Sequence, residues 1–257
     1  PVERHSFGIA VTYTLQRFEG KGLDAFDNPF FSAEPGSVTD NGHDTAHGWG
    51  LSLGWIGQVH ENLSLALSWS SRIDTGEFDD YAGLFADQGG FDVPEHYGAG
   101  FSWQAADDLT LAGDWQRIQY SETNSVGNEL APLLAGIPLG SDNGPGFGWD
   151  DVDVFKLGGE YALGDRFVLR AGVSHVDQPI PSDQTFFNIL APGVMEDHVS
   201  VGFTWTSRSI GEWSLAYTRA LDNRVKGQGS IPAAFGGGEV DLSMNQDILG
   251  IGWSLSL

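Results

Sequence analysis

The chain has 257 residues, no cysteine and a formal net charge of -23, with 35 Asp and Glu against 12 Lys and Arg. This charge argues against nucleic acid and anionic lipid surfaces as partners, because both carry negative phosphates. No run of about 18 apolar residues is present, which excludes a transmembrane helix but not membrane strands, since those need only about ten residues with half of them polar.

Alternation of apolar and polar residues with a period of two predicts ten β-strands. In the last of them Leu249 and Ile251 lie on one side, and Gly250 and Gly252 lie on the other. Because successive residues of a strand point to opposite faces, such strands have one apolar, aromatic face and one small, polar face. In chain order the expected strands are 5–18, 47–59, 63–73, 95–105, 109–120, 151–163, 166–176, 198–206, 213–221 and 240–257.

The contrast between the two faces is typical of a transmembrane barrel, whose strands face lipid on one side and a wet lumen on the other. Parity along the strands places four tryptophans on the lipid face: Trp69, Trp103, Trp205 and Trp253. It places four small residues on the lumen face: Ser64, Gly100, Ser200 and Ser254. Tryptophan is enriched where a barrel meets the membrane interface, which supports this assignment.

The connections between the expected strands alternate strictly in length. Four are only a few residues long, at 58–62, 105–108, 163–166 and 207–212. Five are long, at 19–46, 74–94, 121–150, 177–197 and 222–239. The alternation puts every tight turn at one end of the sheet and every long loop at the other, as in outer-membrane barrels. A soluble β-sandwich or propeller, the alternative fold, has no reason to sort its connections in this way.

Several motifs in a fixed order resemble one family of membrane barrels. The stretch 148–161 reads GWDDVDVFKLGGEY, and 169–172 (LRAG) and 178–181 (QPIP) follow it. The stretch 91–95 (FDVPE) precedes an expected strand, and 190–192 (LAP) precedes another. Together these segments resemble the FadL/TodX-type (OMPP1) outer-membrane transporters of hydrophobic compounds, and the resemblance spans nearly the whole chain.

The resemblance implies an all-β protein: an antiparallel, up-and-down transmembrane β-barrel of about fourteen strands, with short periplasmic turns, long extracellular loops and an internal N-terminal hatch. Residues 1–257 are then a single barrel domain without the hatch and roughly the first four strands, a barrel closed by ten strands being the alternative. The start at Pro1, without initiator Met or signal peptide, indicates a processed or truncated N-terminus. The expected location is the outer membrane of a Gram-negative bacterium, as a monomer among membrane lipid and lipopolysaccharide.

In this family the loops that correspond to 19–46 and 74–94 form an apolar capture groove. The resemblance therefore implies a substrate-binding set in these two loops: Leu23, Phe26, Phe30, Phe31, Phe78, Tyr81, Leu84, Phe85 and Phe91. So much aromatic surface on solvated loops is costly unless the loops pack together or bind something. The alternative is a small hydrophobic core within the loops, and both readings can hold, since a groove needs walls.

Two further loops carry apolar clusters. The loop 177–197 contains Phe186, Phe187, Ile189 and Leu190. The loop 121–150 contains Leu130, Leu133, Leu134, Ile137 and Leu139, with prolines that allow at most a short helix. The segment 130–139 is expected either to fold over the barrel mouth as a lid or to pack on itself.

Two cations are expected on the lumen face. Arg170 lies between Leu169 and Ala171, and Lys156 lies between Phe155 and Leu157, so parity turns both inward. A lumen cation can hold a fatty-acid carboxylate through a charge-assisted hydrogen bond. The alternative is that both cations form ion pairs that tie the wall together, with Asp114, Asp153 or Glu160.

Neither an enzyme nor a cofactor is expected. No GxSxG, phosphate-binding loop or dinucleotide-binding motif is present. His43 and His47 with Asp44 form a weak candidate for a metal site. The favoured function is passive transport of long-chain fatty acids or hydrocarbons through a gated barrel. The alternative is a structural or interaction barrel whose acidic loops bind cations, surface polymers or proteins.

Overall fold

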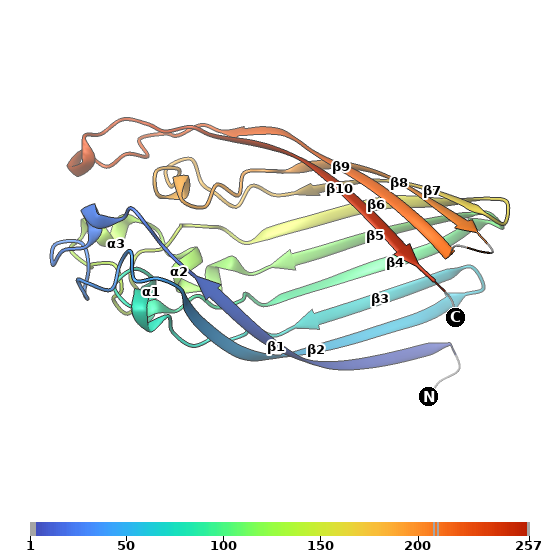
Figure 1. The fold of residues 1–257 in the computed structure, drawn as a ribbon, viewed down its shortest axis with the longest axis horizontal. Helices are drawn as coiled ribbons and strands as arrows, with labels where there is room; N and C mark the ends of the chain where they lie inside the picture. The colour runs from blue at the N-terminus through green and yellow to red at the C-terminus, as the bar shows by residue number, and fades with distance from the viewer. Residues whose placement is uncertain (1–3, 208, 210, 256–257) are drawn as a thin grey trace.

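The computed structural model describes residues 4–207, 209 and 211–255. Ten antiparallel strands form a single sheet in which each strand pairs with its neighbours in the chain (Figure 1). The strands are β1 (His5–Phe18), β2 (Asp44–His60), β3 (Leu63–Ser70), β4 (His96–Ala106), β5 (Leu109–Ile118), β6 (Val152–Leu163), β7 (Phe167–Val176), β8 (Asp197–Ser207), β9 (Gly211–Val225) and β10 (Leu242–Ser254). This confirms the predicted all-β, up-and-down architecture.

The largest difference from the predicted strands concerns β9, which extends four residues further toward the long loops than predicted, to Val225, whereas β10 begins two residues later than predicted, at Leu242. Leu242 pairs with Val225 there, and the register shifts between Met244 and Gln246. A bulge of this kind bends the strand and increases its twist. The residues directly after Leu221 are polar and do not alternate with apolar ones. A prediction from the two-residue period alone therefore ends β9 too early.

Register shows that the two faces are separated across the whole sheet, because directly paired residues share a face. On one face Trp205 pairs with Trp213, which pairs in turn with Trp253. On the other face Gly100 pairs with Asp114, and Ser200 pairs with Thr218. The predicted partition of tryptophans and small residues between the faces is confirmed.

The aromatic face of the sheet is exposed. Phe7 and Ile9 in β1 and Ile251 in β10 are among the many large apolar side chains that the protein leaves uncovered there. Apolar surface of this extent requires a cover, which lipid supplies to a barrel wall. No helix in the described ranges is long and apolar enough to cross a membrane.

The long loops gather at one end of the sheet and the short turns lie at the other, as predicted (Figure 1). The loops contain the short helices η1 (Asp24–Phe26), η2 (Asp79–Tyr81), α1 (Ala86–Gly89), η3 (Tyr120–Glu122), α2 (Asn124–Gly127), α3 (Ala131–Leu134), η4 (Phe187–Ile189) and η5 (Ala233–Phe235). The main hydrophobic core of the described chain lies among these loops and not within the wall.

Candidate functional site

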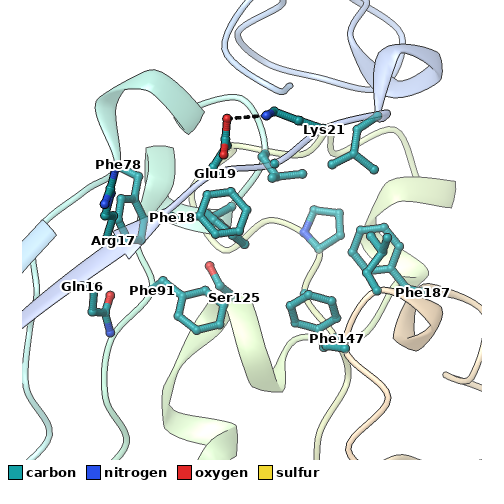
Figure 2. Close-up of a pocket in the computed structure, with 18 residues that line it drawn as sticks. Gln16, Arg17, Phe18, Glu19, Lys21, Phe78, Phe91, Ser125, Phe147 and Phe187 are labelled. Atoms are coloured by element: carbon teal, nitrogen blue, oxygen red, sulfur yellow. Dashed lines mark ion pairs between the residues drawn. The ribbon is translucent and has the colours of Figure 1, made fainter. Parts of the chain in front are cut away.

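The long loops enclose an apolar cavity of about 580 Å³ (Figure 2). Its lining comes from the end of β1 and from the loops that follow β1, β3, β5 and β7. The large apolar side chains of the lining are Phe18, Leu23, Phe78, Leu84, Phe85, Phe91, Phe147, Phe187 and Leu190. A concave site of this size and character binds small apolar molecules by removing their surface from water.

Phe18 connects the wall to the cavity, since it is the last residue of β1. Its ring centroid lies 4.8 Å from that of Tyr81 and 4.9 Å from that of Phe85, both in edge-to-face geometry. Phe85 in turn lies 4.9 Å from Phe91. Such aromatic pairs are worth about 0.5–1.5 kcal/mol beyond their buried area, so the lining is fixed to the end of a strand.

Tyr81 supports the cavity from behind and does not line it. The side chain is fully buried, and its hydroxyl oxygen accepts the Gly20 N–H at 3.1 Å. The same hydroxyl donates to the Gly42 carbonyl oxygen at 2.6 Å. One phenol therefore joins both ends of the β1–β2 loop to the β3–β4 loop, which makes Tyr81 a positioning residue.

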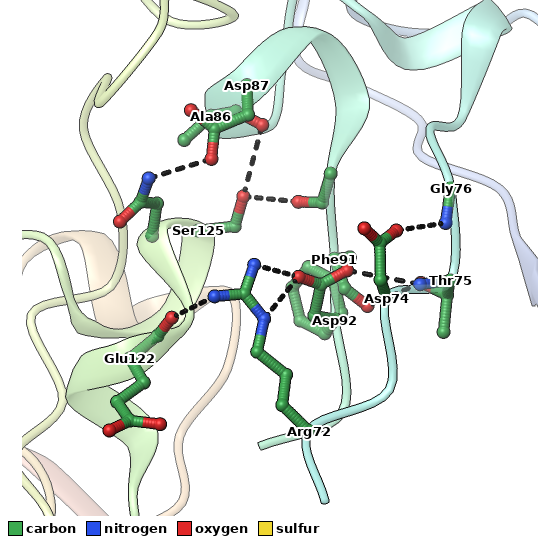
Figure 3. Close-up of polar contacts among 12 residues, drawn as sticks. Arg72, Asp74, Thr75, Gly76, Ala86, Asp87, Phe91, Asp92, Glu122 and Ser125 are labelled. Carbon is green, nitrogen blue, oxygen red and sulfur yellow. Dashed lines mark hydrogen bonds and ion pairs between the residues drawn. The ribbon is translucent and has the colours of Figure 1, made fainter. Parts of the chain in front are cut away.

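Polar contacts join the β3–β4 loop to the β5–β6 loop (Figure 3). The Arg72 guanidinium forms an ion pair with Asp92 and donates to the Glu122 carbonyl oxygen at 2.8 Å. Ser125, which also lines the cavity, donates its hydroxyl to the Gly90 carbonyl oxygen. These bonds hold two walls of the cavity together from outside its apolar surface.

Charged groups lie at the rim of the cavity. Lys21 Nζ lies 2.7 Å from Glu19 Oε1, and this hydrogen bond lowers the pKa of Glu19 and raises the pKa of Lys21. Both groups are therefore charged at neutral pH and neutralise each other. Arg17 also belongs to the lining, and the described residues provide it with no ion-pair partner.

Apart from Tyr81, the residues expected to form a capture groove fall into three groups. Five of them line the cavity: Leu23, Phe78, Leu84, Phe85 and Phe91. Phe26 and Phe31 pack against the loop core from outside, and Phe30 is 80% exposed. The groove and the loop core are the same region, because buried Phe78, Leu84 and Phe85 belong to both.

The segment 130–139 packs against another loop. Leu130, Leu133 and Leu139 are buried in the loop core. Leu139 accepts a hydrogen bond from the Ala33 N–H at 2.9 Å and donates to the Phe31 carbonyl oxygen at 2.8 Å. The segment also forms backbone hydrogen bonds within itself, such as that from the Ile137 N–H to the Pro132 carbonyl oxygen at 3.0 Å, so it packs both on itself and on the β1–β2 loop.

Lys156 and Arg170 lie in the wall, on the face of Gly100 and Ser200, and not in the loop cavity. Arg170 Nε lies 2.7 Å from Glu160 Oε2, and its Nη1 donates to Thr204 Oγ1 at 2.6 Å. Arg170 thus has the wall-tying contacts of the alternative interpretation. Lys156 faces Asp114 across the strand pair, and no ion pair to Lys156 is found in the described part of the chain.

Some lining residues were missed by the sequence reasoning. Phe147 is the only large apolar side chain between Leu139 and Trp149, and Phe18 ends a strand, so neither belongs to a cluster along the chain. By strand parity Arg17 lies on the aromatic, outward face of β1, so nothing in the sequence indicated that it lines a cavity. Arg17 and Phe18 lie at the end of β1, where a long loop begins, and this position is the one signal by which they could have been found.

The metal hypothesis for His43, His47 and Asp44 finds no support. No group of three or more His, Asp or Glu side chains within the described ranges is arranged to hold a metal ion. His43 Nε2 instead lies 3.4 Å from Glu19 Oε2.

Comparison with known families decides the membership of the chain. A family model described as outer membrane protein transport protein (OMPP1/FadL/TodX) matches residues 3–254. The chain belongs to this family. The family consists of outer-membrane transport proteins for hydrophobic compounds and not of enzymes. A comparison with curated proteins by sequence found no match.

Solved structures of FadL-type barrels are similar to this one. The toluene transporter TodX of Pseudomonas putida has a TM-score of 0.58 and 15% identity, over 98% of this chain and 65% of that one. A FadL homologue of Pseudomonas aeruginosa has a TM-score of 0.61 and 17% identity, over 95% and 62%. The CymD monoaromatic hydrocarbon channel has a TM-score of 0.57 and 15% identity, over 97% and 68%. The fold is therefore that of a FadL-type barrel wall, and the chain spans about two thirds of these proteins.

Proposed function

We propose that this protein passes long-chain fatty acids or hydrocarbons across the outer membrane of a Gram-negative bacterium, by passive diffusion through a gated barrel. Residues 1–257 act as one barrel domain in a wall of more strands, a proposal that the greater length of the similar structures supports. The protein works as a monomer without a cofactor, with its aromatic face against membrane lipid and lipopolysaccharide. Family membership supports the transport of apolar compounds.

The observation that carries this proposal is the aromatic cavity at the loop end. Leu23, Phe78, Leu84, Phe85 and Phe91 contact the substrate there. Burial of each methylene contributes about 0.8 kcal/mol, so a small hydrocarbon binds weakly enough to leave again toward the lumen. Diffusion along a concentration gradient needs weak, successive sites of this kind.

The lumen provides a second contact for substrates with a carboxylate. Lys156 is exposed on the lumen face and has no ion pair in the described part of the chain. An exposed lumen ammonium is available to a carboxylate, whereas the guanidinium of Arg170 is already bound to Glu160. We assign Lys156 to transient carboxylate contact and Arg170 mainly to the wall.

Two neighbouring residues give a matched test of the cavity. Leu190 is 53% exposed and lines the cavity, while Ile189 is 52% exposed and does not. Leu190→Asp places a carboxylate at an apolar mouth, and we expect it to reduce uptake of toluene and of oleate at least about fivefold, because desolvating that charge is costly. Ile189→Asp carries the same charge and should leave uptake unchanged.

Uptake is measured in cells that carry equal amounts of folded wild-type or variant protein in the outer membrane. If wild-type cells take up neither compound faster than cells without the protein, the transport proposal is wrong and the structural barrel is favoured. If both variants match the wild type, the cavity is not on the route.

A further inference from the structure

A second, smaller pocket lies beside the aromatic cavity, between the β3–β4 loop and the β5–β6 loop, and Figure 3 shows several of the residues around it. We call it the acidic pocket, because four of its lining residues carry carboxylates: Asp74, Glu77, Asp87 and Asp92. Its volume is about 100 Å³, which is enough for an ion with several water molecules. Glycine and polar residues make up the lining, so the pocket does not suit an apolar substrate.

The two arms of the β3–β4 loop bring these carboxylates together. Glu77 on the first arm lies opposite Gly90 on the second arm in an antiparallel bridge. Asp92 on the second arm accepts the Thr75 N–H of the first arm through Oδ1 at 3.2 Å. Asp74 directly precedes Thr75, so both arms contribute carboxylates to the same pocket.

The β5–β6 loop supplies the rest of the lining, through Thr123, Asn124 and Ser125. The Asn124 side-chain amide donates to Asp87 Oδ2 at 2.8 Å, and the Ser125 hydroxyl donates to the Gly90 carbonyl oxygen. An ion in the acidic pocket therefore lies at the contact between the two loops.

Negative charge in the acidic pocket exceeds positive charge. Among the described residues Arg72 is the one basic side chain of the lining, and its guanidinium already forms an ion pair with Asp92. The carboxylates of Asp74, Glu77 and Asp87 form no ion pair in the described part of the chain. Like charges gathered in one small space repel each other, and a bound cation removes that cost.

Thr123 provides a second, independent indication of a ligand. The residue is 2% exposed, it belongs to the lining of the acidic pocket, and its hydroxyl has no hydrogen-bond partner among the described residues. Thr123 is also the N-cap of α2, where a threonine hydroxyl commonly accepts a backbone N–H, but here it forms no such bond. Buried hydroxyls nearly always have a partner, because an unsatisfied one costs free energy. This hydroxyl is therefore available to an ion or to the water that an ion holds.

The chemistry of the lining indicates which ion fits. Carboxylate, hydroxyl and water oxygens are the ligands of hard divalent cations. No three carboxylates of the described chain are arranged to hold a metal ion by themselves, so the ion must keep water and take ligands of mixed kind. Calcium accepts such irregular sets, whereas magnesium requires a near-ideal octahedron. Asp74 and Glu77 are exposed, so the ion can enter from solvent.

We propose that the acidic pocket binds a calcium ion through Asp74, Glu77, the Thr123 hydroxyl and water, and that this ion ties the β3–β4 loop to the β5–β6 loop. The role of the ion is structural: it neutralises the carboxylates and joins two loops that otherwise meet through a few hydrogen bonds.

The acidic pocket adjoins the wall of the aromatic cavity. Ser125 lines both spaces, and Glu77 directly precedes Phe78, which lines the cavity. Asp92 directly follows Phe91, another lining residue. Calcium therefore braces one wall of the cavity from outside, and this second part of the proposal rests on the function proposed for the cavity.

Calcium binding is tested on the full chain in an uncharged detergent, free of lipopolysaccharide, which itself binds cations. We expect a dissociation constant of about 0.1–1 mM in a calorimetric titration with CaCl₂, as for extracellular calcium modules. At ten times that concentration, amide hydrogen exchange in 74–92 and 120–127 should slow about tenfold, because a ligand stabilises the closed state by the factor 1 + [L]/Kd. MgCl₂ at the same concentration should protect much less.

Matched variants separate this site from general attraction by acidic loops. Asp74→Asn and Glu77→Gln should each weaken calcium binding about tenfold, because each removes a charged ligand from the ion. Asp79→Asn removes a carboxylate from the same loop outside the lining and should leave binding unchanged. Thr123→Val should also weaken calcium binding, while in calcium-free buffer exchange in 120–127 should not increase, because the hydroxyl forms no bond there.

Three results would overturn the calcium site. The first is exchange that does not respond to calcium, and the second is equal protection by calcium and magnesium. The third is an equal loss of binding in Glu77→Gln and Asp79→Asn, which would show that the loops only attract cations diffusely.

Toluene binding to the same protein distinguishes this proposal from the function proposed for the cavity. Calcium should raise the affinity for toluene about fivefold, the lower end of ordinary coupling between two sites, and this gain should be absent in Glu77→Gln. Equal toluene affinity with and without calcium would overturn the bracing of the cavity. Calcium protection of the loops without any toluene binding would contradict the function of the cavity and leave the calcium site standing.

Discussion

The wall of ten strands and the end formed by the long loops place their apolar residues in opposite ways. In the wall, large side chains such as Phe7 and Ile251 are exposed on one face, and the strands are held by backbone pairing. At the loop end, Phe78 and Leu139 are buried in a core between loops. A barrel wall obtains its apolar cover from lipid, whereas the loops must provide their own. Substitutions should therefore affect the two regions separately.

The largest effect is expected where a charge enters the lipid face of the wall. Val173 is exposed on the aromatic face and Ser174, its neighbour, lies on the lumen face. Val173→Arg should destabilise the barrel by about 2–4 kcal/mol, because the charge must leave water for the bilayer. Ser174→Arg should destabilise the barrel much less than Val173→Arg does, because the lumen face is wet. Urea unfolding in phospholipid vesicles measures both, and equal losses would show that the faces are assigned wrongly.

The next effect should stay within the loop end. Tyr81→Phe removes the acceptor of the buried Gly20 N–H and the donor to Gly42. The loss should loosen the loop core by about 1–3 kcal/mol, the cost of a buried unsatisfied group. Amide hydrogen exchange should rise in 19–43 and 79–85 while the strands of the wall keep their protection. Faster exchange throughout the wall would mean that the loops and the wall fold as one unit.

A smaller effect distinguishes the two lumen cations. Arg170→Met leaves Glu160 without its ion pair at a partly exposed site, and we expect a loss of about 0.5–1 kcal/mol in barrel stability. Lys156→Met should leave stability unchanged but weaken binding of oleate relative to oleyl alcohol. Thermal unfolding and paired binding assays on both variants test this division. If Arg170→Met weakens the binding of oleate more than the binding of oleyl alcohol, Arg170 and not Lys156 contacts the carboxylate.

The smallest effect concerns the base of the β9–β10 loop. The Gly227 N–H and the Arg224 guanidinium bind the Asp241 carboxylate and lower its pKa. The pKa of Asp241 is lower in the folded protein than in the unfolded chain. The contribution of these hydrogen bonds to the stability of the loop is therefore complete above the ordinary carboxyl value of 3.8, and it is lost as the pH falls through the folded pKa. Pepsin cleavage in 226–241 should therefore increase with acidity in the wild type. Because the activity of pepsin itself changes with pH, the ratio of cleavage in Asp241→Asn to cleavage in the wild type is the measured quantity. This ratio should exceed one above the folded pKa and approach one as the pH falls through it; a ratio that does not change with pH would contradict the account.

The strands were predictable from the sequence because their signal is local. Residues such as Leu249 and Gly250 alternate between two environments, and a two-residue period is visible without tertiary contacts. The sorting of short and long connections followed from the same pattern. The end of β9 was missed because the pairing continues through polar residues beyond the register shift between Met244 and Gln246.

The site was predictable only in part, because loops have no period. Phe78, Phe85 and Phe91 were found since they cluster along the chain, and the resemblance named their loop. Phe235 stands alone in its loop, so nothing in the sequence connects it to Phe31, 204 residues away. The partner of Arg170 was among the proposed alternatives, but only the register of β6 and β7 places Glu160 opposite to it.

The central claim is that apolar molecules bind in the cavity between the loops and not on the outer face of the wall. A crystal of the protein soaked with bromobenzene tests it directly, because bromine scatters anomalously and locates the ligand without a model. The account predicts an anomalous peak among Phe18, Phe85 and Phe147, which disappears in Leu190→Asp and persists in Ile189→Asp. Bromine peaks confined to the aromatic outer face of the wall, with an unoccupied cavity, would contradict it.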